Sequence, residues 1–322
     1  MLARIRRETC IWEIPSRAPI CDCLMSSAGR ADMLLDVSEI ELVGAGGEPV
    51  DFKRTLASHG LADLLPNGLD QDAWTLETTL DVGGRAHRVR LSEGSAGTAR
   101  VDGAQRTLPV IRHMLRLDED LSRFYALVAE DEELSWVTRG AGRMLRSPTV
   151  FEDVIKTVCT TNCAWSGTVR MVTALVENLG IQGRTFPSPE AMADAPVEFY
   201  RDVARAGYRG PYLQAIARAV ADGELDLEAL DGRSDLPDEE VAERLLALPG
   251  VGPYAAAHVM MLLGRYGRLV LDSWTRPTYA RLAQRKTVKD TTIERRFRRY
   301  EDFAGLAFWL YITRDWVPDP RT

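Results

Sequence analysis

The sequence has few cysteines and histidines and no long apolar run, and each shortage excludes a class of protein. The five cysteines stand at positions 10, 21, 23, 159 and 163, an odd number that argues against a disulfide framework. The four histidines have no metal-ligand spacing. The longest apolar stretches fall far short of the roughly 20 residues that a membrane-spanning helix needs. A membrane protein, a zinc-bound scaffold and a disulfide-rich scaffold are therefore not expected.

The N-terminal segment lacks the features of a secretory signal. It has a few arginines but no continuous apolar core ahead of a small-residue cleavage site. We interpret residues 1–32 as a disordered tail or as the result of a mis-assigned start, with Met33 as the natural first residue. Retention in a reducing compartment is expected.

The overall composition is that of a globular protein. The chain has 322 residues, of which 45% are hydrophobic and 27% are charged. This length is enough for about two domains of roughly 100–200 residues each. The net charge of −7 argues mildly against nucleic acid as a partner. Because net charge is a sum over the whole molecule, the local distribution of charge decides that question.

Apolar residues alternate with polar ones over about residues 36–110, which is typical of half-buried strands. Gly83-Gly84 is expected to form a hairpin turn, and Asp102-Gly103 is expected to mark another. A short helix that ends at Gly60 is expected between the first strands. The pattern predicts a small antiparallel sheet with a helix.

The period changes to 3.6 after about residue 117 and stays helical. Thr149 and Glu152 have the spacing of a capping box and predict the start of a helix. We therefore predict an α+β antiparallel domain over residues 33–116, followed by an all-helical domain over residues 117–322.

The most informative segment, residues 245–259, reads LLALPGVGPYAAAHV. It meets every position of the helix-hairpin-helix pattern, with glycines at its sixth and eighth positions. Both glycines let the backbone approach a phosphate without a Cβ in the way, and the free amides of the second helix attract an anion. A hairpin that merely packs in the core is the alternative. The residues predicted to bind the DNA backbone are Leu248, Pro249, Gly250, Val251 and Gly252.

A basic stretch follows the hairpin. Residues 276–299 contain nine basic residues and two acids, although the whole chain is acidic. Such a run is either a solvated face or a further phosphate contact.

An aspartate at a characteristic distance adds a resemblance to a known family. Asp272 ends an apolar run 20 residues after Gly252, and the chain here resembles the helix-hairpin-helix (HhH-GPD) superfamily of DNA glycosylases. That superfamily has an essential aspartate at this distance from its hairpin. Four segments recur in the same order in its oxoguanine and alkylpurine branches. They are Cys159-Thr160-Thr161-Asn162, Phe186-Pro187-Ser188, Gly207-Tyr208-Arg209 and Leu248-Pro249-Gly250-Val251-Gly252.

The resemblance implies base excision from double-stranded DNA that contains a damaged or modified base. A nucleotide is flipped out of the duplex, and its N-glycosidic bond is hydrolysed through an oxocarbenium-like state. Asp272 matches the carboxylate that stabilises this state and orients the attacking water. A helix cap or an arginine partner is the alternative role for Asp272. Asn162 matches a family residue that lies near the gap left by the flipped base. The resemblance also implies a monomer, because relatives act as monomers. A cytoplasmic, nucleoid-associated enzyme is expected.

Departures from the family pattern narrow the branch. Bifunctional members carry a Schiff-base lysine where this chain has Tyr254, so we expect no lyase activity. No cysteine follows Cys163, so we expect no iron–sulfur cluster. Trp274 replaces a histidine that is common in oxoguanine enzymes. Both aromatic replacements favour the alkylpurine branch.

The resemblance also implies a base pocket and an ion site. Electron-rich rings stack on positively charged alkylated bases, and the candidates are Tyr254, Trp274, Trp309 and Tyr311. Family hairpins often bind Na+ or K+ through backbone carbonyls, which here would be those of Leu246, Leu248 and Val251. No other cofactor is expected.

The leading hypothesis is a monofunctional DNA glycosylase for damaged or modified purines, with alkylated purines favoured. An enzyme for oxoguanine or another modified base is the first alternative. A catalytically silent DNA-binding protein and a hairpin that binds another protein are the others.

Overall fold

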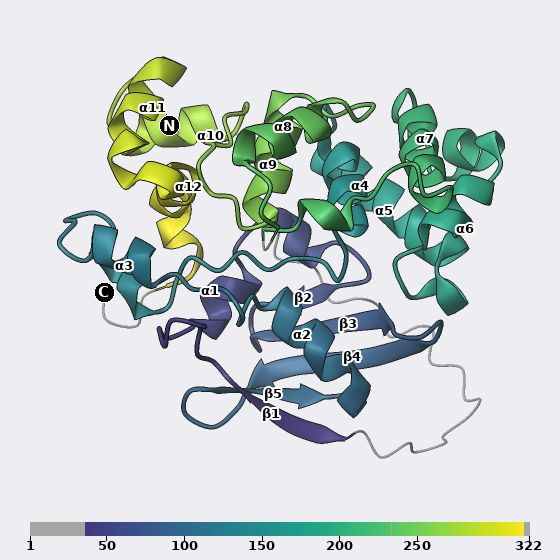
Figure 1. Cartoon of the computed structure of the whole chain (residues 1–322), viewed down its shortest axis with the longest axis horizontal. Helices are drawn as coiled ribbons and strands as arrows, with labels where there is room; N and C mark the ends of the chain where they lie inside the picture. Colours follow the sequence, from purple (N-terminus) through teal and green to yellow (C-terminus); the bar gives the residue numbers. More distant parts are fainter. Residues whose placement is uncertain (1–35, 233, 319–322) are drawn as a thin grey trace, which may run out of the picture.

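The computed structural model describes residues 36–232 and 234–318, and it has two layers (Figure 1). An antiparallel sheet forms one layer, and most of the helices form the other (Figure 1). The predicted tail at residues 1–32 lies outside the described residues.

The sheet has five strands in the order β1-β5-β4-β3-β2, and neighbouring strands are antiparallel. The strands are β1 (Val37–Glu41), β2 (Gly68–Asp70), β3 (Thr75–Asp81), β4 (Ala86–Glu93) and β5 (Thr98–Asp102). The predicted turn at Gly83-Gly84 joins β3 to β4, and both glycines have positive φ. Asp102-Gly103 does not form a hairpin, because the chain leaves the sheet there and enters the helix over Leu108–Met114. The second tight hairpin lies between Glu93 and Thr98 instead.

The described residues outside the sheet form α-helices, short 3-10 and π segments, and loops. The α-helices are α1 (Phe52–Leu56), α2 (Leu108–Met114), α3 (Ser122–Val128), α4 (Val150–Thr160), α5 (Trp165–Leu179), α6 (Pro189–Asp194), α7 (Arg209–Ala221), α8 (Asp238–Leu246), α9 (Pro253–Leu262), α10 (Thr275–Leu282), α11 (Asp290–Phe297) and α12 (Ala304–Thr313). The short helix expected to end at Gly60 is α1, which ends four residues earlier, at Leu56. Among the described residues, none of the helices has both the length and the apolar character to cross a membrane.

Helix α4 is the central helix of the helical layer, with all of its residues buried and with contacts to α5, α7 and α9. Half of the predicted capping box is confirmed, because the Thr149 hydroxyl accepts the N–H of Glu152 at 3.2 Å. The Glu152 carboxylate pairs with the buried Lys156 at 2.7 Å, which neutralises both charges inside the protein. At the other end of α4, the Thr160 hydroxyl lies 3.2 Å from the Tyr254 hydroxyl on α9.

Each layer has its own hydrophobic core, and each core includes residues from the other part of the sequence. The sheet packs against α1 and α2, and Leu145 from the helical part of the sequence joins this core. Leu61 and Leu64, which come from the first part of the sequence, pack in the helical core. The two layers are therefore interlocked rather than joined by a single linker.

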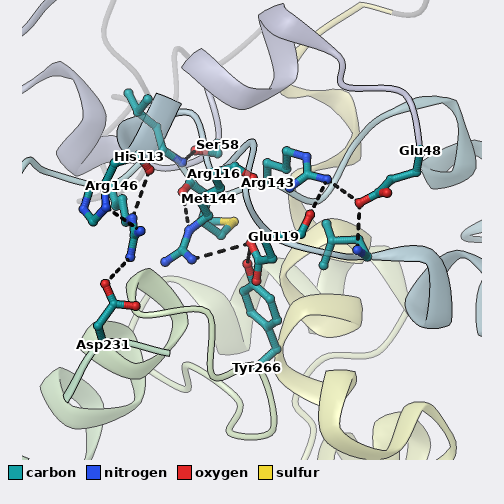
Figure 2. Close-up of polar contacts among 12 residues, drawn as sticks. Glu48, Ser58, His113, Arg116, Glu119, Arg143, Met144, Arg146, Asp231 and Tyr266 are labelled. Atoms are coloured by element: carbon teal, nitrogen blue, oxygen red, sulfur yellow. Dashed lines mark hydrogen bonds and ion pairs between the residues drawn. The ribbon is translucent and has the colours of Figure 1, made fainter. Parts of the chain in front are cut away.

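Charged side chains also connect the layers (Figure 2). Arg143 pairs with Glu48, and both side chains are almost fully buried. Arg146 binds Asp231 at 2.9 Å, and its Nη2 donates a hydrogen bond to Nδ1 of His113 at 2.6 Å. Because a buried charge without a partner is costly, these pairs hold the sheet layer and the helical layer in one relative position.

Candidate functional site

Asp272 lies in the loop between α9 and α10 and caps α10. Its Oδ1 accepts the N–H groups of Trp274 at 2.8 Å and Thr275 at 2.6 Å, and the Thr275 hydroxyl accepts the N–H of Asp272 at 2.8 Å. The helix-cap role that the sequence left open is therefore present. The cap fixes the orientation of the carboxylate at the positive end of the α10 dipole. A reactive carboxylate also requires a fixed orientation.

Arg276 follows Asp272 by four residues, and its pKa is raised by a hydrogen bond with Asp290 and, to a smaller extent, by the charge of Asp272. Its guanidinium forms a bidentate pair with Asp290 at 2.8 and 2.9 Å. Arg276 also lines a groove of about 700 Å³ between the α8–α9 pair and the C-terminal helices, together with Tyr254 and Leu271. The groove therefore reaches the residue that precedes Asp272.

Tyr254 lies in the first turn of α9 and is half-buried. Burial raises the pKa of its hydroxyl, and the negative charge of Asp272 raises it further, against the opposing effect of the hydrogen bond with Thr160. The phenol therefore stays protonated at neutral pH. The charge of Asp272 acts on the Tyr254 hydroxyl, although 18 positions separate the two residues in the sequence.

Three of the four predicted pocket residues belong to one aromatic cluster. The ring of His258 stacks on Tyr254 with a centroid distance of 6.1 Å and on Trp309 with a distance of 6.3 Å. Trp274 lies 6.0 Å from Trp309 and 5.6 Å from Trp316. His258 and Trp316 were not predicted from the sequence. Their signal was weak, because a histidine inside an apolar helix is more often a core residue.

Burial lowers the pKa of His258 well below its ordinary value, and the nearby His59 lowers it further. The imidazole is therefore neutral and extends the electron-rich cluster. Trp309 is 1% exposed, and its indole N–H donates to the carbonyl of Ser58 at 2.8 Å. Trp309 thus backs the cluster from inside the core.

The prediction that Tyr311 belongs to the same pocket is corrected by the structure. Its ring lies 4.5 Å from the Arg296 guanidinium and 5.8 Å from the Tyr279 ring, beside a separate cavity of about 670 Å³. Two helical positions correspond to a rotation of about 200°, so Trp309 and Tyr311 face nearly opposite sides of α12.

The turn between α8 and α9 uses its two glycines differently. Gly250 has a φ of +81° and packs so closely on α7 that an added Cβ would lie 2.7 Å from Cδ2 of Tyr212. An added Cβ on Gly252 would meet no atom within 4 Å. Leu248 and Val251 are buried beneath the turn. The protein itself therefore requires the glycine at 250, whereas open space at 252 fits the close approach of a ligand.

Asn162 is connected to this turn through Tyr208 and Tyr212. It follows α4, is exposed, has a φ of 45°, and donates from Nδ2 to the hydroxyl of Tyr208 at 3.3 Å. Tyr208 is 52% exposed, and its ring lies 6.0 Å from that of Tyr212, the residue that touches Gly250. Sequence reasoning did not assign a role to Tyr208. The segment Gly207-Tyr208-Arg209 was the available signal.

The basic stretch downstream of the hairpin is partly neutralised. Within the part of the chain that the structure describes, Arg276, Arg296 and Arg299 make ion pairs with Asp290, Glu133 and Asp131. The cysteines near the site are free thiols, Cys159 buried and Cys163 half-buried. No group of three or more histidine, cysteine or acidic side chains with metal-binding geometry occurs among the described residues.

The arrangement of helices and sheet defines a class of fold. The 3-methyladenine DNA glycosylase of Archaeoglobus fulgidus matches with a TM-score of 0.66 at 22% identity, over 87% of this chain and 100% of that chain. The 8-oxoguanine glycosylase/lyase of Clostridium acetobutylicum, in its apo-form, matches with a TM-score of 0.65 at 18% identity, over 86% of this chain and 96% of that chain. The chain therefore shares the fold of these two DNA glycosylases.

A curated protein and a further solved structure are also similar. The Bacillus subtilis protein YfjP, named provisionally as a DNA-3-methyladenine glycosylase, is 30% identical over 81 residues. That match covers 25% of this chain and spans about a quarter, 27%, of the relative's length. The Clostridium enzyme in complex with double-stranded DNA, with cytosine opposite 8-oxoguanine, matches with a TM-score of 0.60 at 19% identity, over 79% of this chain and 91% of that chain. No protein-family model matches the sequence.

Proposed function

We propose that this protein is a DNA glycosylase of base excision repair, which flips a damaged or modified purine out of the duplex and hydrolyses its N-glycosidic bond. The observation that carries the proposal is the carboxylate of Asp272, fixed at the start of α10 in the fold of DNA glycosylases, where its charge acts on the Tyr254 hydroxyl. A catalytically silent DNA-binding protein needs no such carboxylate and is the weaker alternative.

In the proposed mechanism, the bond between the sugar C1′ and the base nitrogen breaks as positive charge develops on the sugar. Asp272 stabilises this charge electrostatically, and it orients or deprotonates the water that attacks C1′. The two backbone N–H groups on Oδ1 hold the carboxylate before the substrate arrives. Preorganisation of this kind removes the need to reorient the group during the reaction.

We propose that the enzyme is monofunctional and leaves an abasic site. The residue in the first turn of α9 is Tyr254, which has no amine to form a Schiff base. Lys156, the lysine on the neighbouring helix α4, is buried and bound to Glu152 at 2.7 Å and to the carbonyl of Leu64 at 3.3 Å. These contacts support hydrolysis without strand cleavage.

The proposed substrate is an alkylated purine. Such bases carry a positive charge, and aromatic faces attract cations. Tyr254 lines the groove and offers such a face, and the buried rings of His258, Trp274 and Trp309 pack behind it. The pKa shift of His258 keeps its ring neutral. Oxoguanine is the second candidate, because the fold is as similar to an 8-oxoguanine glycosylase/lyase as to a 3-methyladenine glycosylase.

We propose that the α8–α9 pair acts as a helix-hairpin-helix and that Leu248–Gly252 bind the phosphates of one DNA strand. The amides at the start of α9 have no helical carbonyl to bond to, and the dipole of the helix attracts an anion. The Leu248 carbonyl accepts the N–H of Val251 at 3.2 Å. We propose that its second lone pair and the carbonyls of Leu246 and Val251 bind a Na+ or K+ ion. The enzyme is proposed to act as a monomer in the cytoplasm, at the nucleoid.

A panel of duplexes tests the proposal, each with one alkylated purine, hypoxanthine, 8-oxoguanine or uracil. Strand cleavage is measured with and without alkali. We expect cleavage that depends on alkali for one class of purine, and we expect Asp272→Asn to abolish it. Salt-sensitive binding to DNA without base release from any duplex would favour the silent DNA-binding protein.

A further inference from the structure

We propose that Arg209 is a positioning residue that holds Asn162 and Tyr208 in the conformation in which they enter damaged DNA. The inference rests on the proposed function, because it concerns how Arg209 holds residues of the proposed DNA-binding face in place. Arg209 itself is 7% exposed and lies beneath that face, at the first residue of α7.

The guanidinium of Arg209 binds the backbone on which Asn162 is carried. Its Nε donates to the carbonyl of Thr161 at 2.9 Å, and its Nη2 donates to the carbonyls of Thr161 and Asn162, the latter at 2.9 Å. These carbonyls follow the end of α4. A cation at this position also complements the negative end of the helix dipole. The three hydrogen bonds leave the loop little freedom to change its path.

Asn162 needs this support because its backbone is in the left-handed region, with a φ of 45°. Residues other than glycine adopt this region at a cost in free energy, although asparagine tolerates it better than most. The hydrogen bond from Arg209 to the Asn162 carbonyl fixes the peptide that follows the strained residue. Without that bond, the loop is expected to relax toward an ordinary turn, and the Asn162 side chain then points elsewhere.

Arg209 also fixes the second exposed group. Its guanidinium carbon lies 4.5 Å from the centre of the Tyr208 ring, in a cation–π contact. The Tyr208 hydroxyl accepts the hydrogen bond from Nδ2 of Asn162 at 3.3 Å. Arg209, Tyr208 and Asn162 therefore each contact the other two. The guanidinium of Arg209 is buried, and the polar ends of Tyr208 and Asn162 are exposed.

The unit is held next to the α8–α9 turn through the same helix. Tyr212 follows Tyr208 by one helical turn and packs on Gly250. Arg209 thus ties the end of α4 to the helix that supports the proposed phosphate-binding turn. The fixed spacing means that a duplex held at the turn meets Asn162 and Tyr208 in one defined place.

The test is binding to two fluorescent duplexes of one sequence, one intact and one with a tetrahydrofuran abasic-site analogue. The ratio of the two Kd values measures recognition of the gap in the stack and needs no knowledge of the excised base. We expect Arg209→Met to lower this selectivity by about tenfold or more, as the loss of hydrogen bonds from a charged donor predicts. We expect binding to the intact duplex to change little.

Three further variants complete the test. Arg209→Lys keeps a cation but loses the planar guanidinium, which donates from two nitrogens and lies against the Tyr208 ring, so it should retain part of the selectivity. In the Asn162→Ala background, Arg209→Met should have little further effect, because the side chain whose position depends on Arg209 is already absent. Arg265→Met is the matched control, since Arg265 is also 7% exposed and binds the carbonyl of Leu236 at 2.8 Å. It should lower the Tm and leave the selectivity unchanged.

The outcomes separate the inference from the proposed function. Full selectivity in both folded Arg209 variants overturns the inference, as does an effect of Arg209→Met that is undiminished in the Asn162→Ala background. Wild-type protein that binds neither duplex overturns the proposed function instead. A loss of selectivity in Arg265→Met as large as that in Arg209→Met would show that reduced stability alone is the cause and would also overturn the inference.

Discussion

Tyr212 packs against Gly250, and this contact joins α7 to the turn between α8 and α9. It explains why the two glycines of the turn are not equivalent. At Gly250 both the positive φ and the neighbouring ring exclude a side chain, whereas the space around Gly252 is open. Folding therefore requires the glycine at 250, whereas the glycine at 252 leaves room for the proposed contact with a DNA phosphate.

Gly250→Ala should lower the free energy of unfolding by about 2 kcal/mol, since it places a side chain at positive φ against an aromatic ring. Gly252→Ala should change stability by less than about 0.5 kcal/mol but weaken DNA binding by about tenfold. Urea denaturation and fluorescence anisotropy measure the two effects. Unimpaired DNA binding by Gly252→Ala would contradict the proposed close approach of a phosphate.

Asp272→Asn separates the cap from the chemistry, because an asparagine oxygen still accepts the N–H groups of Trp274 and Thr275. We expect stability close to that of the wild type and a loss of base release of about 10²–10³-fold. Thr275→Ala is the control, since it removes the reciprocal hydrogen bond to the Asp272 N–H and keeps the carboxylate. It should cost about 1 kcal/mol of stability and retain excision. Equal activity of Asp272→Asn and wild type would leave Asp272 as a cap alone.

Borohydride reduction tests whether the protein hydrolyses the N-glycosidic bond without forming the Schiff base of a lyase. A Schiff base between protein and DNA would be trapped as a covalent adduct. We expect no adduct from the wild type with its preferred lesion duplex, because Tyr254 lacks an amine. An adduct that gel electrophoresis resolves would show that another amine reacts, and mass spectrometry of the trapped peptide would identify it.

Asp153 gives a prediction for pH dependence. Burial raises its pKa from 3.8 to about 6, against a hydrogen bond from the Ser147 N–H, and the neighbouring Glu152 raises it further. The charged form is therefore disfavoured in the folded state. This penalty is absent below the unfolded pKa near 4 and grows as the pH rises through about 6.

Asp153→Asn remains neutral and can still accept the N–H of Ser147. Its stability relative to the wild type should be near zero at pH 4 and rise to about 3 kcal/mol above pH 7, from a shift of about two pKa units. Urea unfolding at a series of pH values measures this difference. A difference that is constant over the whole pH range would show that Asp153 titrates normally in the folded protein.

The periodicity of the sequence predicts much of the fold. Alternating residues predict the sheet strands, Gly83-Gly84 predicts one hairpin, and Thr149 predicts the start of α4. These features depend on residues close together in the chain, where backbone geometry is set locally. The misplaced second turn at Asp102-Gly103 has the same origin, because a turn signal does not say whether the next segment returns to the sheet.

The candidate site divides in the same way. The sequence by itself determines the glycine-containing turn, the tyrosine in place of a lysine, and the aspartate that follows, because each depends on residue identity at a fixed spacing. The tertiary structure alone places His258 between Tyr254 and Trp309, turns Tyr311 away from them, and brings Arg209 beneath Asn162. These relationships depend on how helices rotate and pack against one another, and packing involves partners from distant segments that no local pattern specifies.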